Sequence, residues 1–357
     1  MTKVVALGGG HGLAATLTAL RQITNQLTAI VTVADNGGSS GRLREEFPIF
    51  PPGDLRMALA ALCADDEWGR TWAQIMQHRF ESNGELNGHA MGNLLLASMW
   101  NAGDDPVVAL DRVGQLLKVI GRVLPMASVA LDIEGTFNTS TGRIVVRGQK
   151  EVATAKGHIE SLRIIPQDPA ARSEALNAIE DADWITMGPG SWFSSVIPHL
   201  LVPAQLDALR TSKARKVLIL NLDATSHTQG EEFAGSTPEE HLEFFHRYAP
   251  GLTVDYCLVD HSVVRDEQAL QLAASTLGGE IVVADIRKAP GSIHHDAQKD
   301  VVYLHQDLAQ SNQRGGDEKL DECRSYDQLG AVYQRQGLVQ LNQQGDERSP
   351  TYDIQLC

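Results

Sequence analysis

The stretch Val4-Val-Ala-Leu-Gly-Gly-Gly-His-Gly-Leu-Ala-Ala15 indicates how this chain begins to fold. A short apolar run, residues 4–7, meets glycines at once, and from Leu13 to Ile23 the apolar residues recur at helical spacing. Residues 27–33 are again apolar and β-branched. This order predicts a strand, a tight turn, a helix and a second strand, and the helical crossover makes the two strands parallel.

Further along the chain the same alternation returns. It predicts helices at 54–62, 91–100 and 107–119 and strands at 184–187, 217–220, 253–259 and 281–284. Residues 36–41 are rich in glycine and serine and are expected to lie in one long loop, after which Asp54 caps the next helix. Short β-branched runs between about 122 and 165 predict a small antiparallel insert.

These patterns together predict an α/β fold, a doubly wound Rossmann-like and mostly parallel sheet with an inserted small β region. We expect one nucleotide-binding domain over residues 1–305. Residues 306–357 are polar and rich in glutamine, a composition that favours a weakly ordered tail.

Charge and cysteine content limit the classes of partner. The formal charge of -15, from 30 basic and 45 acidic residues, argues against nucleic acid or an anionic membrane as the main partner. The four cysteines form no C-x-x-C pair, so neither a zinc site nor a disulfide framework is indicated. No apolar run has the length of a membrane span, and the N-terminus leads directly into a strand. We therefore expect a cytoplasmic protein without membrane insertion.

The glycine turn has the chemistry of a phosphate site. Gly10-His11-Gly12 and the residues after it satisfy the G-x-G-x-x-A form of a dinucleotide turn, and Asp35 follows about twenty residues later. Glycines at positive φ, expected at Gly10 and Gly12, let backbone N–H groups approach a phosphate at a helix N-terminus. A plain strand-to-helix turn is the alternative, but the flanking elements and Asp35 favour binding.

Other polar clusters are expected at the same edge of the sheet. The segment from Asp35 to Arg42 carries a carboxylate, an amide, two hydroxyls and a guanidinium. Residues 188–191 follow one predicted strand, and Asn221 and Asp223 follow the next. An open α/β sheet binds ligands at the carboxyl ends of its strands, so these clusters converge on one rim. The cluster around His89 and Asn93 starts a further helix, although a lone histidine is more often an ordinary loop residue.

At these motifs the chain resembles the YvcK family, whose members are called gluconeogenesis factors, within the superfamily of CofD phospholactate transferases. The segment Ala34-Asp-Asn-Gly-Gly-Ser-Ser-Gly-Arg-Leu-Arg44 carries the resemblance most specifically, and the matching stretches extend from residue 3 to about 300. The resemblance implies a uridine-diphosphate (UDP) sugar as ligand, with NAD(P) as another occupant, and a regulatory role that links carbon supply to cell-wall synthesis and cell shape. The resemblance also implies that the transferase relatives hold a divalent metal with acidic residues.

Several positions depart from the pattern of that family. His11 stands where threonine is usual, His199 where asparagine is common, and His294 where arginine is common. The loop after Asn221 also differs at residues 227–232. If the usual asparagine and arginine contact the ligand, His199 and His294 alter its affinity. The residues nominated for nucleotide binding are Gly8, Gly9, Gly10, His11, Gly12, Asp35, Asn36, Gly37, Gly38, Ser39, Ser40, Arg42, Asp54, Asn93, Gly188, Gly190, Ser191, His199 and Asn221.

Two functions stay open on the sequence. A nucleotide-sugar sensor is favoured because neither a Ser-His-Asp arrangement nor a Cys-His pair is visible, and no catalytic residue is nominated. A metal-dependent phosphotransferase of the CofD type is the alternative, with Asp35 and Asp54 as the two halves of a magnesium site. A third hypothesis, an NAD-dependent oxidoreductase, is supported only by the glycine turn. A homo-oligomer and cell-wall enzymes are further candidate partners.

Overall fold

The structure is a computed structural model that describes residues 2–222, 237–289, 295–296 and 299, with the backbone of 340–341 and 354–355. Contacts within the chain divide it into Met1–Leu308 and Ala309–Cys357. In the second unit, β11 (Gln340–Leu341) and β12 (Ile354–Gln355) form a short antiparallel pair. The prediction of a weakly ordered tail falls almost entirely outside the described residues and stays a prediction.

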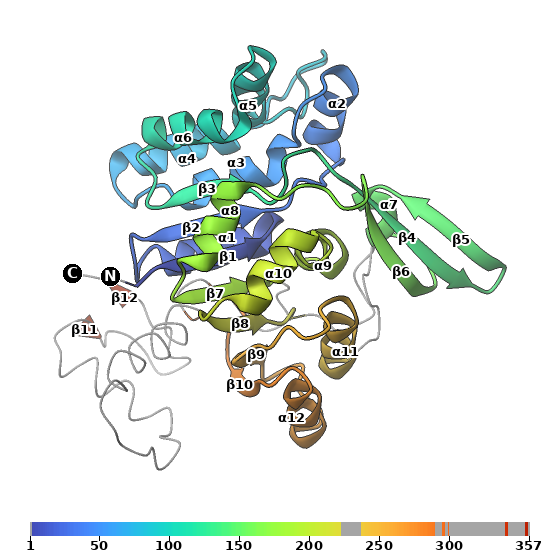
Figure 1. Cartoon of the computed structure of the whole chain (residues 1–357). Helices are drawn as coiled ribbons and strands as arrows, with labels where there is room; N and C mark the ends of the chain where they lie inside the picture. The colour runs from blue at the N-terminus through green and yellow to red at the C-terminus, as the bar shows by residue number, and fades with distance from the viewer. Residues whose placement is uncertain are drawn as a thin grey trace, which may run out of the picture. The chain divides into compact units, whose positions relative to one another are not determined.

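A seven-stranded parallel sheet forms the centre of the first unit (Figure 1). From one edge to the other its strands are β10 (Glu280–Ala284), β9 (Tyr256–Asp260), β8 (Arg215–Ile219), β7 (Trp184–Met187), β1 (Val4–Gly8), β2 (Leu27–Val31) and β3 (Arg122–Pro125). Each strand pairs in parallel with its neighbours. The predicted α/β class is confirmed.

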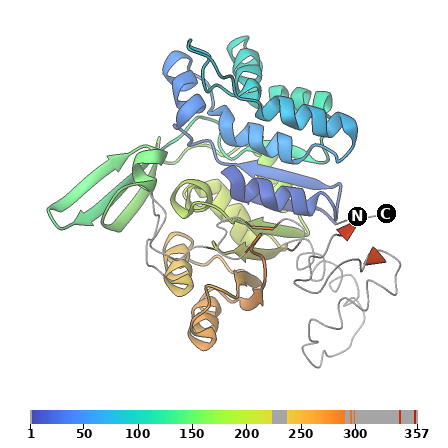
Figure 2. The ribbon, with the colours of Figure 1, turned by 180° about the vertical axis from the view of Figure 1, so that it is seen from behind.

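Helices cover both faces of this sheet. Helices α1 (Gly10–Leu20) and α3 (Pro52–Ala61) lie on one face, and α8 (Ser173–Glu180) and α10 (Pro203–Thr211) lie on the other, as Figures 1 and 2 show from opposite sides. The remaining long helices are α4 (Glu67–Gln77), α5 (Met91–Asn101), α6 (Pro106–Leu117), α11 (Pro238–Tyr248) and α12 (Glu267–Ser275). None of the described helices is long and apolar enough to cross a membrane.

The strand order reverses beside β1, and this reversal places the site. The chain passes from β1 to β2 on one side, whereas β7 returns on the other side of β1. The connections therefore run over opposite faces and leave a crevice outside the carboxyl ends of β1 and β7, which is where open α/β sheets bind ligands. Leu7, Leu13 and Ile30 are fully buried beneath it and hold the first βαβ unit together.

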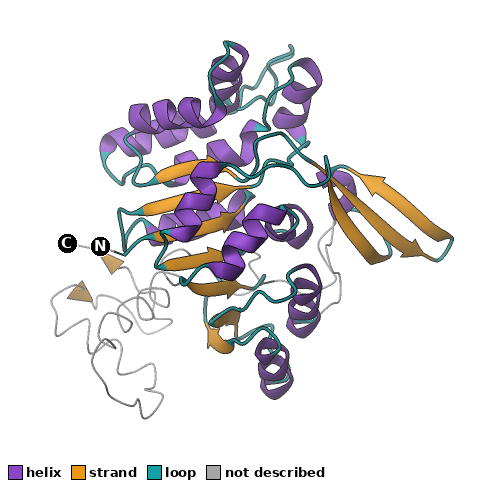
Figure 3. Cartoon of the chain, viewed as in Figure 1, coloured by secondary structure: helices purple, strands orange, loops and turns teal. Residues whose placement is uncertain are grey.

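A three-stranded antiparallel sheet extends from the main body (Figure 3). It consists of β4 (Asp132–Thr139), β5 (Gly142–Arg147) and β6 (His158–Ile165), in the order β5-β4-β6, with the short helix α7 (Gln149–Ala153) after β5. The insert therefore begins at Asp132 and not near residue 122, because β3 completes the edge of the parallel sheet. Short apolar strands have the same sequence pattern in parallel and in antiparallel sheets, so the predicted start of the insert was wrong.

The predicted long loop at 36–41 is wrong, because residues Gly38–Glu46 form helix α2. Small residues are needed there for packing: a Cβ on Gly41 would overlap the carbonyl oxygen of Asn36, and the side chains of Ser39 and Ser40 are buried. Tertiary contacts thus override weak helix propensity. Asp54 also differs from its predicted capping role, since α3 begins at Pro52 with Pro51 as its N-cap and Asp54 lies in the first turn.

Candidate functional site

The glycine turn between β1 and α1 uses its glycines in different ways. Gly9, the N-cap of α1, has extended backbone, and a Cβ there would lie 2.6 Å from Asp54 Oδ2. Gly10 has φ +59°, as predicted. Gly12 does not have positive φ; it must lack a side chain because a Cβ would overlap the carbonyl oxygen of Pro189. Positive φ therefore accounts for Gly10 alone, while close packing accounts for Gly9 and Gly12.

The N-terminus of α1 is capped only in part. Its N-cap, Gly9, has no side chain to offer, but the backbone N–H of Gly10 in the first turn donates to Asp54. His11 lies exposed in this turn. The end of β1 beneath it is held from two sides, because the carbonyl oxygen of Gly8 accepts hydrogen bonds from Thr32 N at 2.9 Å and from His199 Nε2 at 3.2 Å.

Two carboxylates, Asp35 and Asp54, lie next to this turn. Asp35 Oδ1 accepts a hydrogen bond from Gly37 N at 2.8 Å, and its Oδ2 would be 2.5 Å from a Cβ on Gly53. Asp54 is 8% exposed, and its Oδ2 has no hydrogen-bond partner among the described residues. Burial, and after it the negative charge of Asp35, raises the pKa of Asp54 to about 7. An acidic pair with one raised pKa is typical of functional sites.

A buried hydrogen-bond network supports these carboxylates from α2, α3 and α5. Ser39 Oγ lies 3.0 Å from Asn93 Nδ2, a donor, and 3.0 Å from His89 Nδ1. The Ser39 hydroxyl hydrogen is thus left for His89 Nδ1, which places the proton of the neutral imidazole on Nε2. Burial, followed by the charge of Arg42, lowers the pKa of His89. Asn93 Oδ1 accepts from Arg56 Nε at 2.9 Å.

Ser40 has a separate role: its Oγ accepts a hydrogen bond from Gly53 N at 3.0 Å. This bond satisfies one of the first N–H groups of α3 from a neighbouring helix. Ser39 and Ser40 therefore order the helices around the site. The hydrogen bonds of these two serines described above go to protein groups.

Asn36 and Arg42 also bond to the protein. Asn36 Oδ1 accepts from Gln149 N at 2.9 Å, and Asn36 Nδ2 donates to Glu151 at 3.2 Å, so this amide holds the start of α7. The exposed Arg42 donates to the carbonyl oxygen of Asn87 at 2.7 Å. Gly37 and Gly38 form the entry to α2, with Gly38 at φ +48°.

The loop after β7 forms the other wall of the crevice. Gly188 and Gly190 have φ of +80° and +138°, and Gly190 N donates to Asn221 Oδ1 at 2.9 Å, which joins the ends of β7 and β8. The Ser191 side chain accepts from Ser194 N at 3.1 Å and caps the π-helical turn η1 (Trp192–Val196), which leads into the short helix α9 (Ile197–Leu200).

His199 lies in the core beneath the glycine turn. Gln205 Nε2 donates to His199 Nδ1 at 2.8 Å, so Nε2 carries the proton that it donates to Gly8 O at 3.2 Å. Burial lowers the pKa of His199 to about 4, which keeps the ring neutral. These hydrogen bonds support the turn from the core. His294, Asp223 and residues 227–232 lie outside the described residues.

The chain and its fold match a known family. The CofD family, described as 2-phospho-L-lactate transferase, matches residues 4–297. The chain belongs to the CofD family. A provisionally named gluconeogenesis factor of Mycobacterium tuberculosis is 49% identical over 303 residues, covering 83% of this chain and 87% of the relative. A gluconeogenesis factor of Halalkalibacterium halodurans is 39% identical over 286 residues, covering 80% and 85%. The resemblance to the YvcK family is confirmed.

A solved structure agrees with this assignment. The crystal structure of a Bacillus halodurans protein, described as a member of the UPF0052 family, superposes with a TM-score of 0.74 at 34% sequence identity. The match covers 85% of this chain and 98% of that chain. Its agreement supports the doubly wound core described above.

Sequence reasoning missed two features of this CofD-family site. Arg56 was not nominated, yet it is 3% exposed, and burial, followed by the charge of Arg79, lowers its pKa to about 10. His89 was taken as a loop residue, but it belongs to the Ser39 network. A glycine-rich helix followed by Asp-x-Arg is the only sequence signal that could have pointed to this buried polar layer.

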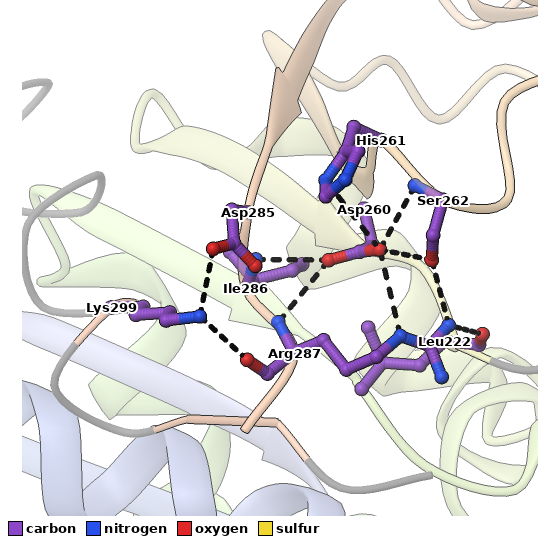
Figure 4. Close-up of polar contacts among 8 residues, drawn as sticks. All are labelled: Leu222, Asp260, His261, Ser262, Asp285, Ile286, Arg287 and Lys299. Carbon is purple, nitrogen blue, oxygen red and sulfur yellow. Dashed lines mark hydrogen bonds and ion pairs between the residues drawn. The ribbon is translucent and has the colours of Figure 1, made fainter. Parts of the chain in front are cut away.

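A second acidic cluster lies at the carboxyl ends of β9 and β10 (Figure 4). Asp260, His261 and Asp285 place possible ligand atoms within 4.8 Å of one another. Lys299 Nζ, however, lies 2.8 Å from Asp285 Oδ2, so a lysine already provides the cation there. Asp260 Oδ2 accepts from the backbone N–H groups of Ile286 and Arg287 at 3.0 and 3.1 Å. The cluster acts as a structural brace, and the sequence did not reveal it.

The brace is connected to the crevice through one arginine. Arg287 donates to the carbonyl oxygen of Leu222, the residue after Asn221. It also donates to Ser262 Oγ at 2.9 Å. The end of β8, where Asn221 contacts Gly190, is therefore tied to the ends of β9 and β10.

Proposed function

We propose that this chain is a regulatory protein that binds a nucleotide sugar, with a UDP-sugar as the first candidate ligand. The observation that carries the proposal is the convergence of the N-terminus of α1 with Asp35 and Asp54 where the strand order reverses. Helix N-termini attract phosphate through free N–H groups and the helix dipole. We expect Asp35, four residues after the end of β2, to accept a hydrogen bond from a ribose hydroxyl.

Electrostatics adds a condition to this binding. A diphosphate at the N-terminus of α1 would approach two carboxylates, and like charges at close range repel. A proton on Asp54 or a divalent cation removes that repulsion. The oxygen atoms of Asp35 and Asp54 are the hard donors that magnesium prefers, and Asp54 Oδ2 has no hydrogen-bond partner among the residues that the structure describes. Where magnesium binds, these two residues would hold it and its charge would neutralise the diphosphate.

The wider role follows from the relatives. Their name, gluconeogenesis factor, supports a role in carbon metabolism for this chain as well. The same proposal includes a link to cell-wall synthesis and cell shape, and a cytoplasmic location. It also includes cell-wall enzymes or a second copy of this chain as partners. NAD(P) is kept as a competing ligand because the glycine turn alone does not distinguish it.

Transfer chemistry of the CofD type is the second candidate. It is favoured by the family description and by the acidic pair, because a metal at Asp35 and Asp54 could activate a phosphoryl group as well as bind it. The two candidates share a site and differ in what happens to the ligand.

One incubation separates the two candidates. The full chain is mixed with a UDP-sugar, with magnesium or with chelator, and bound ligand and products are followed by chromatography. Recovery of intact bound ligand supports the regulatory function, with or without dependence on magnesium. Metal-dependent product formation that is lost in Asp35→Asn would establish the transferase instead. A parallel thermal-shift panel with NAD(P) and free UDP tests the ligand class, because a ligand at about 100 times its Kd adds roughly 2.7 kcal/mol of stability.

A further inference from the structure

We propose that the three-stranded insert is a working part of the ligand site, in which Asp132 is a positioning residue that fixes the Asp35 loop through Arg44. The inference deepens the proposed function and rests on it for the identity of the ligand. It assigns a role to an insert that extends from the main body (Figures 1 and 3).

The first contact is an arginine bridge. Arg44 Nη1 donates to the backbone carbonyl oxygen of Asp35 at 3.1 Å, and Arg44 Nη2 donates to Asp132 Oδ1 at 3.0 Å. Asp132 is the first residue of β4, and its other oxygen accepts from Arg147 of β5 at 3.1 Å. The insert thus reaches the backbone of the residue whose side chain enters the site.

The second contact is made by the corner after β5. Gln149 N donates to Asn36 Oδ1 at 2.9 Å, and Glu151 accepts from Asn36 Nδ2 at 3.2 Å. Gly148 has φ +113°, and a Cβ there would lie 2.5 Å from Asn36 Nδ2. Asp35 and Asn36 are therefore held by two separate parts of the insert.

The bridge is shielded enough from solvent to matter. The side chains of Arg44 and Asp132 are 18% and 27% exposed, unlike ion pairs at the open surface. Partial burial acts to raise the pKa of Asp132, but hydrogen bonds from Arg147 and the charge of Arg44 outweigh it and hold the pKa below its ordinary value. Asp132 therefore stays charged at neutral pH and can orient Arg44.

Restraint of this loop has a direct consequence for binding. A hydrogen bond from Gly37 N orients Asp35 Oδ1, and a hydrogen bond from Arg44 holds the Asp35 backbone carbonyl. A ligand that meets an ordered carboxylate loses less conformational freedom on binding than one that must order it. Loss of the bridge should weaken binding even though Asp132 itself does not have to touch the ligand.

A neighbouring ion pair provides the matched control. Glu134 lies on the same strand and binds Arg163 Nε at 2.7 Å, but this pair joins β4 to β6 within the insert. Its loss removes the same kind of interaction without releasing Asp35. A purely structural role for charges in the insert would make Asp132→Asn and Glu134→Gln behave alike.

Two measurements on the full chain test the proposal. Backbone hydrogen exchange of residues 34–41 is compared without ligand in wild type, Asp132→Asn and Glu134→Gln, and affinity for UDP-glucose is then titrated. We expect faster exchange in Asp132→Asn only, with affinity lowered roughly threefold to thirtyfold, the range for residues that act on a site indirectly. Asp132→Asn added to Arg44→Gln should have little further effect, because both break one bridge.

The outcomes are distinguishable. Wild-type exchange in Asp132→Asn, or equal changes in both variants, would overturn the positioning role. Faster exchange with unchanged UDP-glucose affinity would also overturn it. If wild type binds neither UDP-glucose nor any other nucleotide, the proposed function fails, whereas exchange of residues 34–41 still decides whether Asp132 fixes the loop.

Discussion

Asp54 and Asp260 are buried aspartates on the carboxyl side of the same sheet, yet their surroundings are opposite. Asp260 is completely buried, and the backbone N–H groups of Ser262, Ile286 and Arg287 donate to it. Asp54 is 8% exposed, and one of its oxygens has no partner among the described residues. Burial therefore does not by itself identify a functional acid.

The pKa directions express this difference. Burial acts to raise the pKa of Asp260, but hydrogen bonds from Ser262 and from backbone N–H groups reverse the effect and leave the pKa below its ordinary value. Burial, followed by the negative charge of Asp35, raises the pKa of Asp54 to about 7, and the hydrogen bond from Gly10 N–H and the charge of Arg56 do not reverse this shift. An acid that the fold satisfies is part of the scaffold, whereas an acid that the fold leaves unsatisfied is available to a proton, a cation or a ligand.

The largest loss of stability is expected for Asp260→Ala. The change removes the acceptor for three backbone N–H groups and leaves Arg287 without its buried counter-charge. Breaking a buried charge pair costs roughly 3–5 kcal/mol, which urea unfolding of the full chain would measure. Asp285→Ala, at a partly exposed pair with Lys299, is the control and should cost about 1 kcal/mol or less. Equal losses in the two variants would refute the brace.

Asp54→Asn, unlike Asp260→Ala, should increase the free energy of unfolding at alkaline pH. The folded pKa of about 7 exceeds the ordinary value of 3.8, so the stability linked to this proton is complete below about pH 4 and is lost as pH rises through about 7. The amide cannot ionise, so above pH 7 the variant should be more stable than wild type, by a few kcal/mol at most. Below pH 4 the two should coincide. Urea unfolding across this pH range measures the difference, and a variant less stable at pH 8 would contradict it.

The smallest effect is expected for His261→Ala. His261 is 63% exposed, and its Nδ1 lies 3.9 Å from Asp260 Oδ1, so removing it should change stability by less than about 0.5 kcal/mol. Any melting shift caused by magnesium should persist in this variant and should disappear in Asp54→Asn. The reverse pattern would indicate that magnesium binds at the cluster of Figure 4 and not at the glycine turn.

Much of the fold could be predicted because its signals are local. Residues 184–187 were predicted as a strand and form β7, and the strands at 281–284 and 217–220 differ from β10 and β8 by one or two residues at an end. Helix α2 was missed because its small residues are poor helix formers, and only packing against Asn36 and Gly53 explains them. Residues nominated as ligand contacts, such as Asn36 and Arg42, proved to have protein partners that lie far away in sequence.

The sequence by itself determined the strand-turn-helix order, the parallel sheet that follows from it, and the rim where polar residues gather. Those properties depend on spacing along the chain. Only the tertiary structure decided that His199 lies in the core, that Asp132 reaches the Asp35 loop, and that one oxygen of Asp54 has no partner among the described residues. The physical reason is that charge and hydrogen bonding depend on burial and on neighbours from distant segments, which residue spacing does not encode.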